Sequence, residues 1–548
     1  MYTIGIDFGT ESARALVVDA QTGRVAGSAS AAFAHGVIDD RLPGTGERLG
    51  ADWALQHPGD WLDALTRATR DAVAHAGVSA DQVIGLGIDF TACTVLPVLR
   101  DGTPLALMDG WQGRPHAWPK LWKHHASQPQ ATRVTELAAD TQASWLPRYG
   151  GRISSEWLLP KALQVLDESP DVFAASDLIV EGGDWVVWQL TGRFARNACA
   201  AGYKGLWHKG EGYPADAYLA RLHADLAGFY DTRGGGQDVV AAGARVGTLT
   251  ARWAGQLGLS PTTAVGAAII DAHAGVLGSG AIRPGDLMLI LGTSTCHLLL
   301  SDREALVPGM AGVVEDGIVP GLFAYEAGQA AVGDIFGWFV DGMLPADVKA
   351  EADASGASAH DVLAARAALL RPGESGLLAL DWWNGNRSTL VDAELSGLLV
   401  GATLSTRPAH VYRALIEATA FGTRVIADAL RDGGVPVTRV VAGGGLTRNR
   451  LLMQIYADVL GTPIEVAAAS QASALGAAML GAVAAGRDAG GHVSIADAAI
   501  AMAPAAADTY QPQDAATRVY GELFELYREL YDLFGRQSRL MHQLRALR

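Results

Sequence analysis

Near its start and again near its midpoint, the sequence carries the same short pattern. FGTESARALVVD spans residues 8–19, and LGTSTCHLLLSD spans residues 291–302. Aligned without gaps, the two segments share a Gly-Thr pair and a final aspartate. Each Gly-Thr pair lies between two apolar runs, which predicts two strands joined by a tight turn. A hairpin repeated at this distance predicts two domains of related build, one starting at each copy.

The rest of the chain alternates expected strands and helices, which is typical of the α/β class. The chain is also too long for a single core, so we expect an N-terminal domain over residues 1–282 and a C-terminal domain over residues 283–548. Strands are expected at 24–33, 83–89, 94–99, 437–442 and 464–466, and helices at 58–77, 329–340 and 409–431, from near Thr447 and from Ala472.

The last segment, residues 515–544, has apolar residues at helical spacing and is expected to be a helix packed on the surface. Its predicted packing stripe consists of Val519, Leu523, Leu526, Leu530 and Leu533.

Composition excludes several classes of partner. The chain has 42 basic and 58 acidic residues, a formal charge of −16. Without a concentrated basic patch, this charge argues against nucleic acid or an anionic membrane as a partner. No apolar run reaches the ~20 residues of a membrane span. The three cysteines are scattered and the first residues lack a basic segment, so we expect a cytoplasmic protein.

The Gly-Thr turns are candidate phosphate sites. Gly9 and Gly292 let the backbone approach a ligand closely, and the neighbouring N–H groups and the hydroxyls of Thr10 and Thr293 can donate to phosphate oxygens. One such hairpin is usually only a turn. Two in matching register could hold one triphosphate between them.

The two copies differ in one carboxylate. Asp7 precedes Gly9 by two residues, whereas the equivalent position before Gly292 is Ile290. A single carboxylate suits one Mg²⁺ held through water beside the phosphates. An aspartate capping the turn is the alternative. We favour the metal role because an aspartate within an apolar strand is costly unless something pairs with it.

A third element, VVAGGGLTRN, reads as a strand, a glycine turn at Gly443–Gly445 and a helix. Such turns accept an adenosine or a phosphate against the helix N-terminus. The stretch lacks G-x-G-x-x-G spacing, and no lysine of the chain precedes Ser or Thr, so Rossmann and P-loop interpretations are both disfavoured. By itself the turn could simply cap a helix.

A fourth element, IIDAHAGVLGSGA, places Asp271 after a β-branched run and among small residues. Phosphoryl transfer to an alcohol needs an acceptor for the hydroxyl proton, which a positioned aspartate supplies. His273 is an alternative base, and the surrounding residues do not distinguish the two.

Together these elements resemble the FGGY carbohydrate kinases of the actin/Hsp70/sugar-kinase superfamily. GIDFGTESAR resembles the first phosphate motif, LILGTSTC the second and VVAGGGLTRN the adenosine motif. The resemblance runs from about residue 3 to 485 and leaves out the C-terminal tail. It implies two ribonuclease-H-like domains flanking a catalytic cleft, with ATP and Mg²⁺ as cofactors and a homodimer as the family expectation.

The stretches GIDFTACTVLP, LWKHHA, YGGRISSEWLLPK, AGYKGLWH, YEAGQAAVGDIFGWF, LDWWNGNRS and IEATAFGTR resemble the L-ribulokinase branch most closely. That branch implies phosphorylation of a ketopentose at its terminal hydroxyl, in L-arabinose catabolism. IDAHAGVLG also resembles the D-ribulokinase branch. The preferred epimer therefore stays open.

The resemblance also assigns roles to residues. Asp271 is implied as the catalytic base, and Ala92, Trp122, Lys204 and Glu326 are implied to contact the sugar along with it. As an alternative, Lys204 and Glu326 could be a surface ion pair and Trp122 a core residue. The nucleotide is implied to contact Gly9, Thr10, Arg14, Gly292, Thr293, Gly443, Gly444, Gly445 and Asn449.

Two non-enzymatic classes are rivals. A nucleotide-switched binding protein of the same superfamily needs the phosphate hairpins but not Lys204, Glu326 or the tryptophan-rich motifs. A sugar-sensing regulator that has lost catalysis is expected to lose Asp7 or Asp271, or to gain a DNA-binding segment, and the sequence shows neither change.

Overall fold

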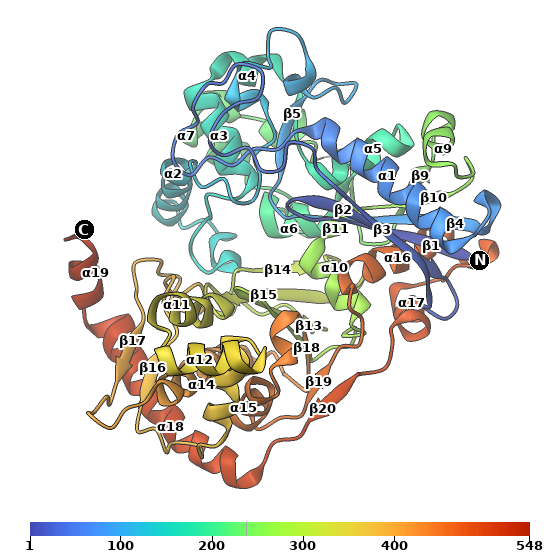
Figure 1. Cartoon of the computed structure of the whole chain (residues 1–548). Helices are drawn as coiled ribbons and strands as arrows, with labels where there is room; N and C mark the ends of the chain where they lie inside the picture. The colour runs from blue at the N-terminus through green and yellow to red at the C-terminus, as the bar shows by residue number, and fades with distance from the viewer. Residues whose placement is uncertain (237, 548) are drawn as a thin grey trace. The chain divides into compact units, whose positions relative to one another are not determined.

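The computed structural model describes residues 1–236 and 238–547, and its contacts divide the chain into two compact units (Figure 1). The main segments of the units meet between Ile282 and Arg283, at the expected domain boundary. Two later segments, Gly312–Ala324 and Gln471–Pro504, nevertheless belong to the first unit. The second unit contains the rest: Arg283–Ala311, Tyr325–Ser470 and the described residues from Ala505 onward. The division of function between residues 1–282 and 283–548 stays a prediction.

The first unit is built on a mixed β-sheet. The strands of the unit are β1 (Tyr2–Phe8), β2 (Ser12–Asp19), β3 (Val25–Ala32), β4 (Val83–Phe90), β5 (Val95–Val98), β6 (Leu178–Glu181), β7 (Arg196–Asn197), β8 (Val239–Val240), β9 (Arg245–Thr248), β10 (Ala264–Gly266), β11 (Ile269–Ile270) and β14 (Gly312–Glu315), of which β5 with β6 and β7 with β8 form separate two-stranded sheets. The sheet has the order β3-β2-β1-β4-β10-β9, with β11 also paired to β4. β1 and β2 form the expected antiparallel hairpin, and β4 runs parallel to β1.

Helices pack on both faces of this sheet. The helices of the first unit are α1 (Pro58–Ala76), α2 (Gln128–Asp140), α3 (Leu158–Glu168), α4 (Pro170–Ala175), α5 (Gly182–Thr191), α6 (Ala198–Gly205), α7 (Asp216–Leu222), α8 (Phe229–Thr232), α9 (Ala251–Leu257), α10 (Asp271–Gly278), α16 (Ala472–Ala485) and α17 (Ile495–Met502). Ile4, Ile6 and Phe8 of β1 share a buried cluster with α1 residues such as Trp61. The alternate residue Gly5 faces α16, so the two helices cover opposite faces.

Glycines allow α16 to lie unusually close to the sheet. A Cβ added at Gly5, Gly85 or Gly87 would clash with a backbone carbonyl of α16. The helix is rich in alanine, and most of its residues are buried. Small residues on both sides therefore bring the helix backbone against β1 and β4, the strands that carry the candidate carboxylates.

The second unit repeats the arrangement. Its strands are β12 (Asp286–Leu291), β13 (Thr295–Ser301), β15 (Phe323–Gln329), β16 (Leu378–Leu380), β17 (Leu398–Val400), β18 (Arg439–Gly443), β19 (Ile464–Val466) and β20 (Asp508–Tyr510). Its main sheet contains the order β15-β13-β12-β18-β19-β20. β12 and β13 form an antiparallel hairpin, and β18 runs parallel to β12. Both units therefore have one hairpin followed by parallel strands on the same side, as the repeated hairpin predicted.

The helices of the second unit are α11 (Gly333–Met343), α12 (Ala346–Ser355), α13 (Ala359–Ala368), α14 (Pro408–Asp432), α15 (Arg450–Leu460), α18 (Asp514–Asp532) and α19 (Leu540–Arg545). Two of these helices begin later in the sequence than expected. α11 begins at Gly333 rather than residue 329, because the chain up to Gln329 completes β15. α15 begins at Arg450 rather than near Thr447, because a 3₁₀ turn over Gly445–Arg448 precedes it.

The predicted packing stripe of the C-terminal helix is only partly right: Val519, Leu523 and Leu530 are half-buried. Leu526 and Leu533 are exposed, at 51% and 44%. The expected single helix is divided into α18 and α19 by a π-helical turn over Leu533–Gln537. The face of α18 that packs inward consists of Ala516, Tyr520, Phe524, Tyr527 and Tyr531.

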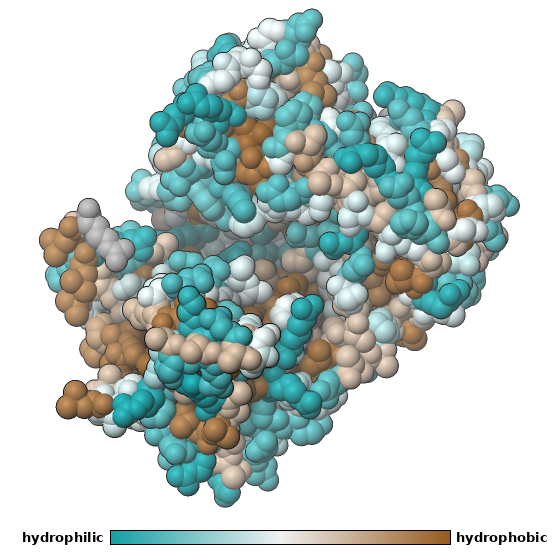
Figure 2. All heavy atoms as spheres, in the orientation of Figure 1, coloured by the Kyte–Doolittle hydropathy of each residue, from teal (hydrophilic) through white to brown (hydrophobic). Residues whose placement is uncertain are grey.

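Hydrophilic residues cover most of the face shown in Figure 2, and hydrophobic ones gather on the C-terminal segment. This segment carries exposed leucines at Leu540 and Leu544. In the described part of the chain, no helix is both long enough and apolar enough to cross a bilayer.

Candidate active site

Three carboxylates meet at one edge of the first unit's sheet. In the parallel pairing of β1 with β4, Asp7 lies opposite Asp89. On the other side of β4, Ile269 of β11 lies opposite Asp89, and Asp271 follows two residues later. The carboxyl ends of parallel strands are where open α/β sheets place their ligands. Two of these carboxylates, Asp7 and Asp271, are predicted site residues.

The third carboxylate, Asp89, was missed by the sequence interpretation. Its side chain is fully buried, and neither carboxylate oxygen has a hydrogen-bond partner among the described residues. Burial, with the nearby charges of Asp7 and Asp271, raises the pKa of Asp89 well above its usual value. A signal was available: GIDF occurs at 5–8 and again at 87–90, and the two copies lie side by side in register.

Asp7 has a cation beside it. The guanidinium of Arg14, opposite Asp7 across the hairpin, donates from Nη1 to Oδ2 at 3.3 Å. The Asp7 side chain is 17% exposed, so it can be reached from solvent. Its oxygen donors are of the kind that Mg²⁺ prefers. The structure thus brings the predicted site residues Asp7 and Arg14 together beside the Gly9-Thr10 turn.

Asp271 begins α10 directly after β11. It is partly exposed, and its Oδ1 accepts from the backbone N–H of Ala272 at 2.7 Å. His273, the alternative base, is 2% exposed and packs on the ring of Tyr203 with 4.4 Å between ring centroids. Geometry therefore favours Asp271 over His273 as the group that a substrate can reach.

α16 points its N-terminal end toward these carboxylates. Along the helix Ala474 lies against Gly5, whereas Gly481 lies against Gly85, nearer the start of β4. The helix thus runs opposite to the strands, and its positive dipole end faces the edge that carries Asp7 and Asp89.

The Thr10 turn is held from two sides. The turn closes with a hydrogen bond of 3.0 Å from Gly9 N–H to the carbonyl of Ser12. The side-chain amide of Gln56 donates to the Thr10 carbonyl at 2.8 Å, and the indole N–H of Trp122 donates to the Thr10 hydroxyl at 3.1 Å. Trp122, expected only in the sugar pocket, therefore also contacts the phosphate turn.

Around Ala92 the backbone is fixed by a buried lysine. Ala92 lies just after β4, and the next residue, Cys93, has a positive φ of 58°. The ammonium of Lys161, from α3, donates to the carbonyls of Cys93 at 2.6 Å and of Leu121 at 2.8 Å. Leu121 precedes Trp122, so Lys161 joins the two segments that carry predicted sugar contacts.

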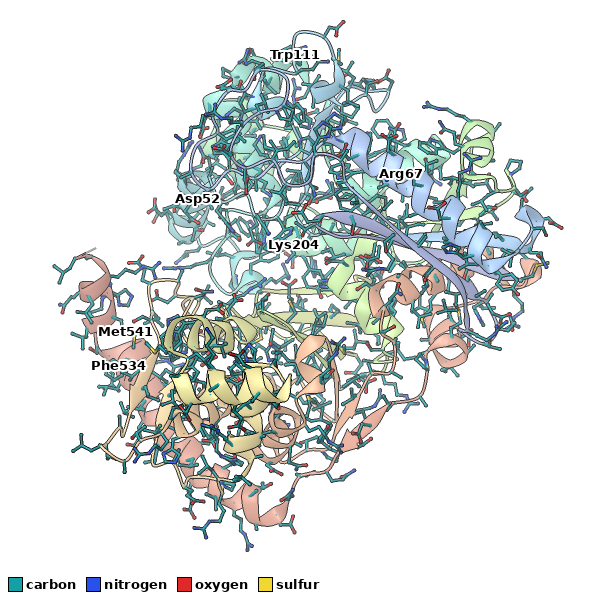
Figure 3. The ribbon with its side chains drawn as sticks, in the orientation of Figure 1. Asp52, Arg67, Trp111, Lys204, Phe534 and Met541 are labelled. Carbon is teal, nitrogen blue, oxygen red and sulfur yellow. The ribbon has the colours of Figure 1, made fainter. Side chains whose placement is uncertain are left out.

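Lys204 lies on α6 and is labelled in Figure 3. It is 4% exposed, and its ammonium lies over the rings of Trp157 and Tyr203, 5.9 and 5.6 Å from their centroids. Aromatic faces stabilise a cation. The two aromatic rings therefore fix the Lys204 ammonium in position. Lys204 is not at the surface, so the alternative of a surface ion pair with Glu326 does not hold.

The second unit contains a pocket at its own Gly-Thr turn. Its volume is about 470 Å³. It is lined by Gly292, Thr293, Gly333, Asp334, Gly337, Trp338, Asp341, Gly445 and Leu446. The structure thus brings the second phosphate turn and one glycine of the adenosine motif together. The α11 residues in the lining were missed, although GDIFGWFVDG spaces them along one helix face.

The glycines of this pocket have different reasons to be glycine. A Cβ at Gly445 would meet nothing within 4 Å, and one at Gly292 would meet only the Ser294 carbonyl at 3.5 Å. The chain itself leaves this space open for a ligand. Gly444, by contrast, has φ of 97° and packs against the carbonyl of Leu291, so its own fold requires glycine.

Gly443 and Asn449, two further predicted nucleotide contacts, lie outside the pocket lining, as Gly444 does. Gly443 ends β18 and pairs with Ile290. The side chain of Asn449 caps α15 by accepting from Leu452 N–H at 3.1 Å. Their roles in nucleotide binding stay predictions.

Glu326, the remaining predicted sugar contact, lies in β15 of the second unit. Its side chain is 4% exposed, and Arg387 donates to it from Nη2 at 3.1 Å. Arg387 belongs to LDWWNGNRS, one of the stretches on which the resemblance rests.

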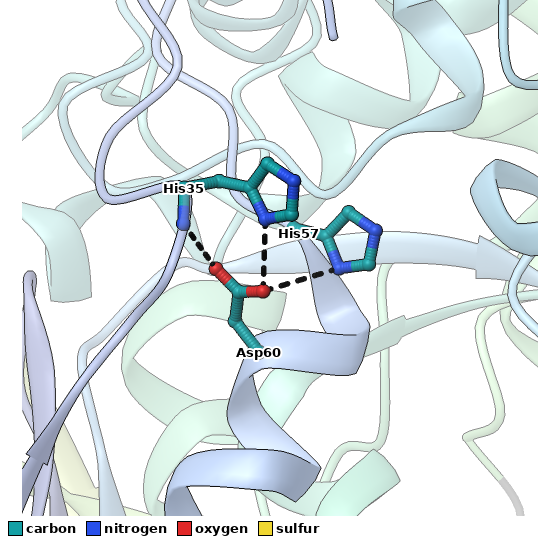
Figure 4. A group of neighbouring side chains, drawn as sticks. All are labelled: His35, His57 and Asp60. Atoms are coloured by element: carbon teal, nitrogen blue, oxygen red, sulfur yellow. Dashed lines mark hydrogen bonds and ion pairs between the residues drawn. The ribbon is translucent and has the colours of Figure 1, made fainter. Parts of the chain in front are cut away.

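A separate cluster of His35, His57 and Asp60 has the composition of a metal site (Figure 4). The two imidazoles are stacked, with planes 12° apart and centroids at 4.4 Å, so their in-plane lone pairs cannot both point at one ion. Nδ1 of His57 already accepts from Gly59 N–H at 3.1 Å. We interpret the cluster as the cap of α1, with Asp60 in its first turn.

Comparison with known proteins identifies the family. Residues 2–211 match the N-terminal domain of the FGGY family of carbohydrate kinases, and residues 287–485 match the C-terminal domain of that family. The chain belongs to this family. Membership confirms the expected enzyme class, a sugar phosphotransferase, and counts against the non-enzymatic rivals.

Relatives that match over their full length show which members of the family this chain is similar to. This kinase is 52% identical to a ribulokinase of Shouchella clausii over 549 residues, covering 100% of this chain and 98% of that protein. It is 50% identical to a ribulokinase of Geobacillus thermodenitrificans, covering 98% and 95%. The solved structure of a xylulose kinase from Rhodospirillum rubrum has a TM-score of 0.79 at 25% identity, covering 99% and 100%. The predicted pair of ribonuclease-H-like domains is confirmed.

Proposed function

We propose that this kinase transfers the γ-phosphoryl group of ATP to the terminal hydroxyl of a ketopentose, and that L-ribulose is its substrate in L-arabinose catabolism. The observation that carries the proposal is the edge where β1, β4 and β11 end. There a phosphate turn, the accessible Asp7 and the accessible Asp271 adjoin one another. Identity of about half over the full length of relatives named ribulokinase supports the choice of sugar.

In this proposal the two Gly-Thr turns and the pocket beside Gly445 hold the nucleotide. Backbone N–H groups and the hydroxyls of Thr10 and Thr293 donate to phosphate oxygens. Asp7 would hold Mg²⁺ through water beside the phosphates, and Arg14 lies where it can balance phosphate charge. The bound ion would neutralise charge on the phosphate oxygens.

On the sugar side, Lys204 and Glu326 supply a charged donor and acceptor for hydroxyls, and Trp122 offers an apolar face. Asp271 orients the attacking hydroxyl and accepts its proton late in the transfer, because the transition state is loose. Exclusion of water limits wasteful ATP hydrolysis.

Replacing Asp271→Asn keeps the shape of the side chain and removes the proton acceptor. We expect turnover to fall at least about 100-fold, while affinity for a non-hydrolysable ATP analogue stays near that of the wild type. Turnover comes from a coupled ADP-release assay and affinity from calorimetry. The matched variant His273→Gln should keep far more turnover. Near-normal turnover in Asp271→Asn would show that another group accepts the proton.

The sugar is tested by measuring ADP release with L-ribulose, D-ribulose, xylulose and glycerol. We expect the highest kcat/KM with L-ribulose. A higher value with D-ribulose would favour the branch that IDAHAGVLG also resembles. No stimulation by any of the sugars would favour a nucleotide-switched binding protein.

A further inference from the structure

The indole of Trp122 reaches the hydroxyl of Thr10, and this contact joins two parts of the site that the proposed function keeps separate. The distance from Nε1 to Oγ1 is 3.1 Å. Both side chains are partly exposed, so each can also contact a ligand. Trp122 is a predicted sugar contact and Thr10 a predicted phosphate contact.

Backbone pairing fixes the position of Trp122 relative to the turn. The segments around Leu55 and Lys120 pair as an antiparallel bridge. Within this pairing, Leu121 N–H donates to the carbonyl of Ala54 at 2.9 Å. Gln56, from the first of these segments, is 1% exposed and donates to the Thr10 carbonyl. These two bridged segments therefore hold the turn from both sides, one through Gln56 and the other through Trp122.

The direction of the hydrogen bond determines what the Thr10 hydroxyl can do. An indole N–H is only a donor, so the hydroxyl must accept from Trp122. Its own proton is then directed away from Trp122 and is available to a phosphate oxygen. Accepting a hydrogen bond also polarises the hydroxyl and strengthens it as a donor.

We propose that Trp122 is a positioning residue for the nucleotide: it orients the Thr10 hydroxyl toward phosphate, and a ketopentose packed against its ring strengthens this grip. The proposal rests on the proposed function. Coupling of this kind is reciprocal, so the nucleotide must strengthen sugar binding by the same factor. Gln56 supports the same turn from its backbone side.

The test uses Trp122→Phe, which keeps an aromatic ring and removes the N–H, and Thr10→Val, which removes the hydroxyl. Affinity for the Mg²⁺ complex of a non-hydrolysable ATP analogue is measured by calorimetry for the full-length wild type, both single variants and the double variant. Loss of one hydrogen bond predicts an affinity about five-fold lower in Trp122→Phe. In the Thr10→Val background, the same change should have almost no further effect.

Repeating the titration with saturating L-ribulose tests the coupling. The sugar should raise nucleotide affinity in the wild type, and Trp122→Phe should lose most of this gain. In steady-state assays KM for ATP should rise about five-fold in Trp122→Phe, with a much smaller change in KM for L-ribulose.

Trp118→Phe is the matched control. Trp118 lies in the same segment and is buried, and its N–H donates to the Gln112 carbonyl and not to the turn. It should leave nucleotide affinity unchanged. Additive effects of Trp122→Phe and Thr10→Val, or equal effects of Trp118→Phe and Trp122→Phe, would overturn the proposal. If the wild type phosphorylates none of the sugars, the proposed function fails, but the nucleotide titrations still decide whether the hydrogen bond matters.

Discussion

Lys161 is a buried lysine that links two segments of the chain through hydrogen bonds to their backbone carbonyls. Its side chain has no exposure, and its ammonium donates to the carbonyls of Cys93, Lys120 and Leu121. An ammonium has three donors, and all three are used. Burial lowers the pKa of Lys161 to about 8. The cost of burying the charge is offset by fixing three loop carbonyls beside the proposed sugar pocket.

Replacing Lys161→Met keeps the aliphatic stem and leaves these three carbonyls without their donor. We expect the free energy of unfolding to fall by about 3 kcal/mol, measured by denaturant unfolding. KM for L-ribulose should rise more than KM for ATP, because the carbonyls belong to the segments of Ala92 and Trp122. An unchanged unfolding free energy would show that the bonds contribute nothing net.

The difference in unfolding free energy between the wild type and Lys161→Met should depend on pH. Lys161 has an ordinary pKa of 10.5 when unfolded and about 8 when folded. Between these values the unfolded state binds more protons than the folded state. The contribution of Lys161 to the free energy of unfolding therefore rises with pH from about 8 to 10.5 and is flat below that window. The stability difference between the wild type and Lys161→Met should widen over this window.

At the residue scale, sequence patterns find groups that face a ligand better than groups that support them. Asp7, Thr10 and Asp271 follow apolar runs or turns, which marks them in the sequence. Lys161 does not stand out, because nothing near it predicts that its partners are carbonyls from residues 40 and 68 positions away. Asp89 could have been found, since GIDF is repeated.

At the scale of elements, α18 shows why helical spacing is not enough. Its leucine stripe and its aromatic stripe both have helical periodicity. The tyrosines lie inward because their hydroxyls find buried partners: Tyr527 donates to Asp381 at 2.8 Å, and Tyr520 donates to Glu417 at 2.9 Å. A sequence shows the two stripes but does not show which of them meets such acceptors.

Replacing Tyr527→Phe removes only the hydroxyl that bonds Asp381. Burial already raises the pKa of Asp381 to about 6, and Gln329 also donates to Asp381, at 2.7 Å. We expect the unfolding free energy to fall by about 2 kcal/mol, because a buried acceptor loses its donor. Leu526→Ala on the opposite face should change it by less than about 0.5 kcal/mol. If Tyr527→Phe and Leu526→Ala lowered the unfolding free energy equally, the leucine stripe would also be a packed face.

At the scale of the whole molecule, the repeated hairpin correctly predicts two domains of related build, each with its own Gly-Thr hairpin. What the sequence does not reveal is that Gln471–Pro504 returns to the first unit. α16 is apolar on all sides and carries no periodic signal that identifies its partner. It packs against glycines of β1 and β4, which lie between 390 and 469 residues earlier in the chain.

Replacing Gly87→Ala tests this packing, because a Cβ there meets the Ala477 carbonyl. We expect the unfolding free energy to fall by about 2–3 kcal/mol, as measured by thermal or denaturant unfolding. Gly445→Ala is the control: its Cβ meets nothing within 4 Å, so stability should hold while affinity for the ATP analogue falls. If Gly87→Ala is as stable as Gly445→Ala, close packing of α16 is not needed.

The late return of α16 has a consequence for biosynthesis. A ribosome delivers β1 and β4 within the first ninety residues, but the helix that covers one face of their sheet is complete only at Ala485. During most of translation this glycine-rich face has no native cover. Early domains usually fold as they emerge, whereas the packing of this N-terminal sheet cannot be completed until α16 has been synthesised.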